Sequence, residues 1–187
     1  AGLVEDIVGV IPEVSDSDDA FKDKKFEQSI ETLILNLETI ISSSVDIDSS
    51  NICKKIVFTS PTPSNGKSFL SRSFAQGLSG IGNKVLLIDA DLKRGDQHKI
   101  FGKETIDLDF FSKLSLDSIN SLKVENNLYF LPKLKRLKNT FEYFYGNLFL
   151  EKLKEFEESF DYIIFDTAPA LSVSDTGLLV SSSNFNF

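Results

Sequence analysis

The stretch TSPTPSNGKSF (59–69) decides the fold that this sequence predicts. It follows the apolar run KKIVF (54–58) and precedes a helical pattern that ends at a glycine-rich stop near residue 82. A strand, a turn with glycine and a helix beginning at Gly-Lys-Ser are the setting of a phosphate-binding loop, whose backbone N–H groups point at the anion. Lys67 would then reach the outer phosphates, and the Ser68 hydroxyl would ligate Mg²⁺.

The same stretch departs from the strict pattern GxxxxGK[ST], because Pro61 stands where that pattern has its first glycine. A three-residue Gly-Lys-Ser also occurs by chance. The alternative interpretation is a helix that merely begins with a lysine. Further signals must decide between the two.

Carboxylates at the ends of two other apolar runs supply such a signal. KVLLIDAD (84–91) ends in Asp89 and Asp91, and YIIFD (162–166) ends in Asp166. The carboxyl ends of strands in α/β sheets face the crevice where ligands bind. One such Asp could simply cap a turn, but three beside a triphosphate would repel it unless Mg²⁺ lay between them.

The order of patterns along the chain predicts an α/β fold with a mostly parallel sheet and helices on both faces. Unbroken apolar runs predict buried strands at 54–60, 84–91, 126–132 and 161–169. Helical spacing predicts helices at 26–41, 66–82 and 141–159. Residues 1–24 are expected to form an extended segment and an acidic linker, and residues 25–187 a nucleotide-binding domain.

Composition narrows the classes of function. With 187 residues and 41% hydrophobic content, one sizeable core is expected. A formal charge of −8 argues against a nucleic-acid partner, since phosphate neutralisation needs a basic face. The lone Cys53 and lone His98 are too few for a zinc site and fit a reducing compartment, the cytoplasm. The chain contains no methionine, which predicts a piece of a longer protein.

With these residues, the chain resembles the bacterial protein-tyrosine kinases of the BY-kinase type, cytoplasmic domains of polysaccharide co-polymerases. Residues 59–68 resemble the family's phosphate loop TSxxPxxGKS, in which no glycine is required at position 61. VLLIDADLKRGDQHKIFG (85–102) is similar to LLIDADLRRPxxHxxFG, with Gly95 for proline. DYIIFDTAPALSVSDT (161–176) is similar to DxxIIDTPPxLxVxDA.

The resemblance implies a P-loop NTPase fold and a Mg²⁺- and ATP-dependent, autophosphorylating tyrosine kinase that controls exopolysaccharide or capsule chain length and export. It implies a catalytic set of Lys67, Asp89, Asp91 and Asp166, without deciding which Asp is the base. Ser68, Asp89 and Asp166 would contact the metal. The nucleotide would bind to Pro63, Ser64, Asn65, Gly66, Lys67, Ser68 and Phe69. The expected place is the inner face of the cell membrane, beside a membrane-spanning co-polymerase part of the same or a separate chain.

Departures from the family pattern keep two alternatives open. The first helix has Gln28, Glu31 and Ile34 where the family shows ExxRxxR, so the usual arginine-linked ring is not expected. No tyrosine cluster closes the sequence, and missing later strands would leave a sheet edge open to self-association. The alternatives are an inactive nucleotide-binding scaffold and a partitioning-type ATPase. The uncharged Thr62 disfavours the second, because partitioning ATPases carry a lysine in this part of the loop.

Overall fold

The structure, a computed structural model, describes residues 10–12, 24–44, 52–60, 62–63, 65–135, 140–169 and 185–186. The chain divides into two units, residues 1–50 and residues 51–187. Most of residues 1–24, the expected extended segment and acidic linker, lie outside the described residues. The expected domain boundary after residue 24 stays a prediction.

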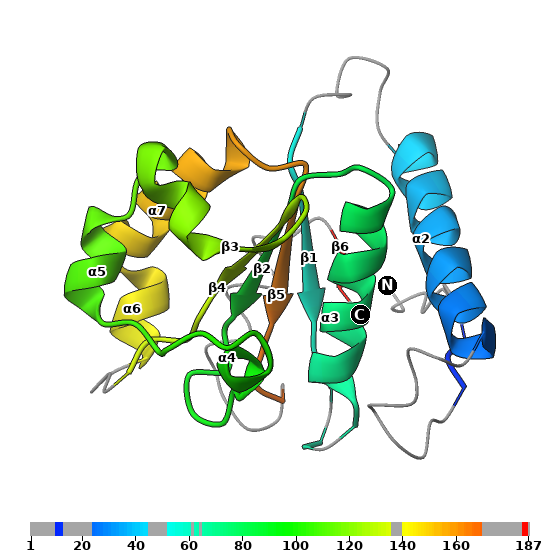
Figure 1. Cartoon of the computed structure of the whole chain (residues 1–187), viewed down its shortest axis with the longest axis horizontal. Helices are drawn as coiled ribbons and strands as arrows, with labels where there is room; N and C mark the ends of the chain where they lie inside the picture. The colour runs from blue at the N-terminus through cyan, green and yellow to red at the C-terminus, as the bar shows by residue number, and fades with distance from the viewer. Residues whose placement is uncertain are drawn as a thin grey trace, which may run out of the picture. The chain divides into compact units, whose positions relative to one another are not determined.

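A six-stranded sheet in the order β3-β4-β2-β5-β1-β6 is the frame of the second unit (Figure 1). Its strands are β1 (Lys54–Phe58), β2 (Val85–Asp89), β3 (Lys123–Glu125), β4 (Leu128–Leu131), β5 (Tyr162–Asp166) and β6 (Phe185–Asn186). All neighbouring strands pair in parallel except β3 and β4. The predicted α/β fold with a mostly parallel sheet is thereby confirmed. The short antiparallel β3 was not predicted, because its residues are not a buried apolar run.

Helices cover both faces of this sheet, as expected. They are α3 (Lys67–Gly80), α4 (Gln97–Ile100), α5 (Leu108–Lys113), the 3₁₀ helix η2 (Leu116–Leu122), α6 (Thr140–Tyr145) and α7 (Asn147–Glu157). Side chains alternate between the faces of a strand, so Phe58 packs on Phe74 of α3, with ring centroids 5.5 Å apart. Val57 instead joins the cluster that contains Phe111 and Phe149 from α5 and α7.

The single helix expected at 141–159 is in fact two helices, so this expectation was wrong in detail. Gly146 separates α6 from α7 with φ −72° and ψ 146°, an extended conformation that a continuous helix cannot contain. Glycine is a poor helix former, so the helix is readily interrupted at this residue. The break allows the rings of Phe144 and Phe149 to meet edge to face at 5.1 Å.

The first unit contains α2 (Lys24–Ser44), which matches the predicted amphipathic helix. Its apolar side chains Phe26, Ile30, Leu33, Ile34 and Leu37 are buried. Gln28 and Glu31, which stand at two positions of the family's helix motif, are exposed. Among the helices within the described ranges, none has both the length and the apolar composition of a membrane-crossing segment.

Candidate nucleotide-binding site

The loop between β1 and α3 has the backbone of a phosphate-binding loop. Gly66 immediately precedes α3 with φ 74°, in the left-handed region that a residue with a Cβ rarely adopts. The Ser60 hydroxyl donates to the carbonyl oxygen of Thr62 at 2.8 Å and so closes the first part of the turn. Lys67 and Ser68 are then the first two residues of a 14-residue helix, whose N-terminus favours an anion.

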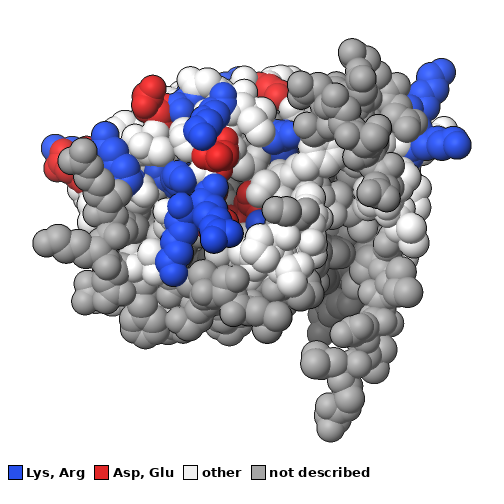
Figure 2. Space-filling view, turned by 90° about the horizontal axis from the view of Figure 1, so that it is seen from below, with Lys and Arg blue, Asp and Glu red and all other residues white. Residues whose placement is uncertain are grey.

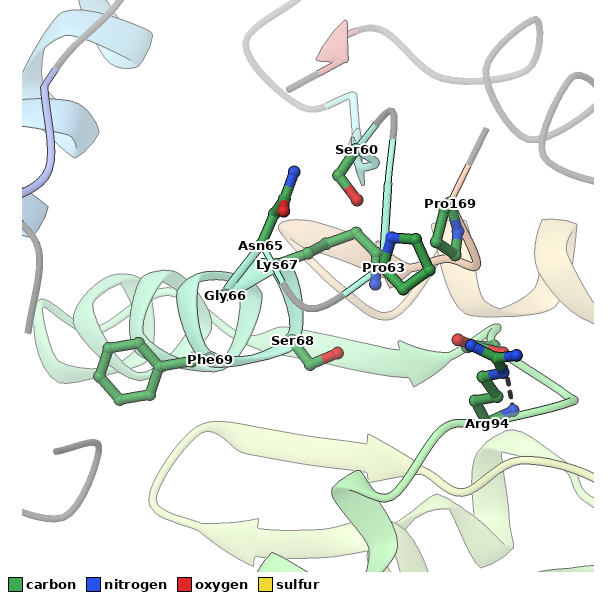
Figure 3. Close-up of a pocket in the computed structure, with 10 residues that line it drawn as sticks. Ser60, Pro63, Asn65, Gly66, Lys67, Ser68, Phe69, Arg94 and Pro169 are labelled. Carbon is green, nitrogen blue, oxygen red and sulfur yellow. Dashed lines mark hydrogen bonds between the residues drawn. The ribbon is translucent and has the colours of Figure 1, made fainter. Parts of the chain in front are cut away.

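A cavity of about 280 Å³ lies against this loop. Its lining residues are Ser60, Pro63, Asn65, Gly66, Lys67, Ser68, Phe69, Asp91, Arg94 and Pro169. In Figure 3, Lys67 extends toward Pro63 and Pro169, whereas the Phe69 ring points away from the other side chains. Three loops, after β1, β2 and β5, therefore meet at one opening, as expected at the carboxyl ends of parallel strands.

Lys67 forms a nearly buried ion pair with Asp166 from the end of β5. The Nζ–Oδ1 distance is 3.1 Å, and the side chains are 10% and 0% exposed. The other oxygen of this carboxylate, Oδ2, accepts a hydrogen bond from Gln97 Nε2 at 2.9 Å. The predicted site residues Lys67 and Asp166, 99 positions apart in the sequence, are thus in direct contact.

Asp89 lies beside Asp166, because the two residues are register partners in β2 and β5. Its side chain is buried, and neither carboxylate oxygen has a hydrogen-bond partner among the described residues. Burial, reinforced by the charge of Asp166, raises the pKa of Asp89 to about 8. Without a bound cation, this carboxyl therefore holds a proton at neutral pH.

Asp89→Asn should make the stability of the ligand-free chain less dependent on pH. Asp89 titrates near 3.8 when unfolded and near 8 when folded, so between these values the folded chain binds more protons. Wild-type stability then falls as the pH rises through this window, by at most about 1.4 kcal/mol per pH unit. Urea unfolding at pH 5, 6, 7 and 8 should show a stability advantage of the variant that increases with pH. A constant difference between the two proteins would contradict the expectation.

Asp91 shapes the loop that follows β2. Its Oδ1 accepts the backbone N–H groups of Lys93 and Arg94 at 3.2 and 2.9 Å, and its carbonyl oxygen accepts that of Gly95 at 2.8 Å. These bonds hold a tight turn that places Arg94 at the cavity, on the side opposite Lys67 (Figure 3). The cavity therefore has a second cation that the sequence reasoning did not select.

The oxygen donors around the cavity fit a polyphosphate with Mg²⁺. Mg²⁺ usually takes one or two protein carboxylates and completes its shell with phosphates and water. The cavity is lined by Ser68 and Asp91, and the nearby chain segment contains Asp89, whose oxygens have no hydrogen-bond partner among the described residues. Within the described part of the chain, no group of three or more His, Cys, Asp or Glu side chains is arranged to hold a metal alone.

The structure thus brings most of the predicted site together. Lys67, Asp91 and most of the predicted nucleotide-binding residues line the cavity, while Asp89 and Asp166 are buried side by side at the ends of β2 and β5. Ser64 lies outside the described residues. The catalytic and metal-binding roles expected for Lys67, Ser68, Asp89, Asp91 and Asp166 remain predictions. The sequence reasoning missed Arg94 and Gln97, although both belong to the quoted block 85–102, because charge and polarity in a loop do not show where a side chain points.

The chain is similar in sequence and in fold to known proteins. Residues 53–185 match a family model described as an AAA domain. The Ralstonia nicotianae protein EpsB, assigned as a tyrosine-protein kinase, is 31% identical over 83% of this chain, which spans 20% of EpsB. The kinase domain of Escherichia coli tyrosine kinase ETK has the same fold, with a TM-score of 0.80 and 20% identity, over 97% of this chain and 76% of that one. A plasmid partition protein from Borrelia burgdorferi superposes over 72% of this chain and 64% of that one, with a TM-score of 0.54 and 25% identity.

The family model and the fold define the class of protein: an α/β domain of the P-loop NTPase type. Within that class, the chain belongs to the bacterial protein-tyrosine kinase (BY-kinase) family.

Proposed function

We propose that this chain is the nucleotide-binding part of a Mg²⁺- and ATP-dependent protein-tyrosine kinase that acts in exopolysaccharide synthesis. The observation that carries the proposal is the Lys67–Asp166 ion pair, whose lysine lines the cavity and directly follows the left-handed Gly66. It supports phosphate binding because a nearly buried lysine, held at a helix N-terminus, is poised to exchange a carboxylate for a phosphate. Family membership supports tyrosine as the acceptor.

In the proposed reaction, the chain's main work is positioning and charge stabilisation. Amide groups around Gly66 and the Lys67 amine would hold the β- and γ-phosphates, and Arg94 would face them from the loop after β2. Ser68, with Asp89 and Asp166, would hold Mg²⁺, which would neutralise charge that develops on the phosphates. Asp89 or Asp91 would accept the proton of the tyrosine hydroxyl, whose ordinary pKa is about 10.

The described tyrosines of this chain are poor acceptors. Tyr129 and Tyr162 are buried, and the ring of Tyr143 packs against Phe111, Phe144 and Phe149, so its pKa is raised by burial. This confirms the prediction that Tyr162 belongs to the core. The side chain of Tyr145 lies outside the described residues. We therefore expect the phosphorylated tyrosine to lie on another segment or another molecule.

Incubation of the full-length protein with γ-labelled ATP and Mg²⁺ tests the proposal. Label should appear on tyrosine, resist the warm alkali that removes phosphate from serine, and fall to background when Lys67 is replaced by methionine. Nucleotide binding without transfer to tyrosine would identify a scaffold instead. Failure to bind nucleotide would refute both functions.

A partitioning-type ATPase is the second candidate, and the likeness to the plasmid partition protein favours it. Such a switch would form ATP-dependent dimers and hydrolyse ATP without producing phosphotyrosine. Thr62, uncharged and exposed, cannot supply the lysine that partitioning ATPases place in this part of the loop. Size-exclusion chromatography with and without ATP separates the two functions.

Basic side chains gather on the side of the sheet where the parallel strands end. Figure 2 shows Lys and Arg side chains gathered on the face at the bottom of Figure 1. Lys93, Arg94 and Lys99 follow β2 on that side, and Lys133 and Lys135 follow β4; all but the half-buried Lys133 are exposed. In a chain of net charge −8, this cationic face would attract the nucleotide.

The proposed protein partner is a membrane-spanning co-polymerase part, and the proposed location is the inner face of the membrane.

A further inference from the structure

Gln97 is a buried amide that contacts two other parts of the phosphate site. It is the first residue of α4 and only 1% exposed. Its Nε2 donates to Asp166 Oδ2 at 2.9 Å and to the Ser71 hydroxyl of α3 at 3.2 Å. A single side chain from the loop after β2 thus joins the end of β5 to the helix of the phosphate loop.

The amide is not explained by packing alone. Gln97 Oε1 is buried and has no hydrogen-bond partner among the described residues, which costs stability that an apolar side chain of the same length would not lose. The compensating interaction is the charge-assisted bond to Asp166, since a bond to an ionised group is about twice as strong as a neutral one. The side chain is therefore suited to acting on this carboxylate.

Asp166 is held through both of its oxygens. Lys67 binds Oδ1 and Gln97 binds Oδ2, so together they determine the rotation of the carboxylate about its last torsion, which is intrinsically broad. When Lys67 turns to a phosphate, Gln97 remains as the neutral donor. Gln97 then keeps the Asp166 carboxylate in its orientation. Because the amide is neutral, it does not compete with Lys67 for the phosphate.

We propose that Gln97 is a positioning residue of the nucleotide site, which acts by holding Asp166. The inference rests on the proposed nucleotide-binding function and adds the residue that couples the loop of Asp91 and Arg94 to the phosphate loop. The coupling is direct, because Gln97 continues the segment in which Asp91 binds the backbone of residues 93–95.

A double-mutant cycle on nucleotide affinity tests this role. The chain, Gln97→Met, Asp166→Asn and the double variant are titrated with a fluorescent ATP analogue and Mg²⁺, after circular dichroism confirms that each is folded. Methionine keeps the unbranched shape and removes the donor. We expect about tenfold weaker binding in the wild-type background, equivalent to about 1.4 kcal/mol, and less than about twofold in the Asp166→Asn background.

Gln76→Met is the matched control, because Gln76 Nε2 donates to Glu125 Oε1 at 2.8 Å, another amide–carboxylate bond, between residues that do not line the cavity. Its affinity should stay within about twofold of wild type. Equal losses from Gln97→Met in both backgrounds, or equal losses from the two glutamine variants, would overturn the role of Gln97. A wild-type chain that does not bind the probe would instead refute the proposed function itself, and this inference with it.

Should Asp166→Asn by itself abolish binding, the pair can be exchanged. Gln97→Glu combined with Asp166→Asn keeps one amide and one carboxylate in contact with their polarity reversed, and Lys67 retains a nearby anion. This exchange should restore affinity to within about tenfold of wild type, whereas Gln97→Glu alone should not bind. An exchanged pair as weak as its single variants would also overturn the inference.

Discussion

Replacing Lys67 by methionine should weaken binding of Mg²⁺ and ATP by roughly 10- to 150-fold. A charge-assisted bond of a partly desolvated ammonium to phosphate contributes about 1.5–3 kcal/mol to binding. The Lys67 amine is predicted to form such a bond with the outer phosphates. The same change leaves the buried Asp166 without its cation, with Gln97 still donating to Oδ2, and should lower the free energy of unfolding by about 3 kcal/mol. Isothermal titration calorimetry and urea unfolding measure the two effects.

Lys55→Met controls for the loss of one lysine from an ion pair. Lys55 binds Glu157 at 2.7 Å, on side chains that are 20% and 31% exposed, and does not line the cavity. This partly solvated pair contributes about 1 kcal/mol or less, and its loss should leave ATP affinity unchanged. If Lys67→Met bound ATP within about threefold of wild type, the proposed phosphate site would be wrong.

Gly95→Ala should disturb the site with an even smaller chemical change. A Cβ at this position would lie 2.0 Å from Asp89 Oδ1 and 2.6 Å from its Cγ, well inside van der Waals contact. Because Asp89 is buried, either its carboxyl or the loop of Asp91 and Arg94 must move. We expect a loss of about 1–3 kcal/mol in stability and about tenfold weaker ATP binding.

Gly80→Ala is the matched control for this prediction. Gly80 ends α3, has open space around an added Cβ and does not have a left-handed φ. Alanine should be neutral or stabilise the chain there by up to about 1 kcal/mol. Thermal unfolding and ATP titration of both variants measure the two effects. Equal stability and equal ATP affinity of Gly95→Ala and Gly80→Ala would contradict the expectation.

The clash also bears on the family resemblance. The resembling pattern has proline at position 95, and its Cβ would meet the same Asp89 oxygen in this structure. Gly95, which has no Cβ, therefore leaves room for the Asp89 carboxyl in the conformation that it adopts here. The sequence showed the departure from the pattern but not its cause, since nothing in the local sequence places residue 95 against residue 89.

The sequence alone predicted the strands β1, β2, β4 and β5, the phosphate loop and the aspartates at the ends of β2 and β5. These features depend on local patterns: unbroken apolar runs, a Gly-Lys-Ser helix start, and a carboxylate where each run stops. It also predicted that the ends of β2 and β5 would meet, because parallel strands place their carboxyl ends at one edge. The break at Gly146 and the strands β3 and β6 escaped prediction: the break falls within a helical pattern, and neither strand is a long apolar run.

Only the tertiary structure decided which atoms in the site touch. It paired Lys67 with Asp166, left both oxygens of Asp89 without a hydrogen-bond partner among the described residues, and brought Arg94 and Gln97 into the site. The physical reason is that these contacts join separate loops, and their geometry follows from strand register and turn conformation. A local sequence pattern places a residue at a strand end or in a loop, whereas the packed sheet determines which side chains it meets there.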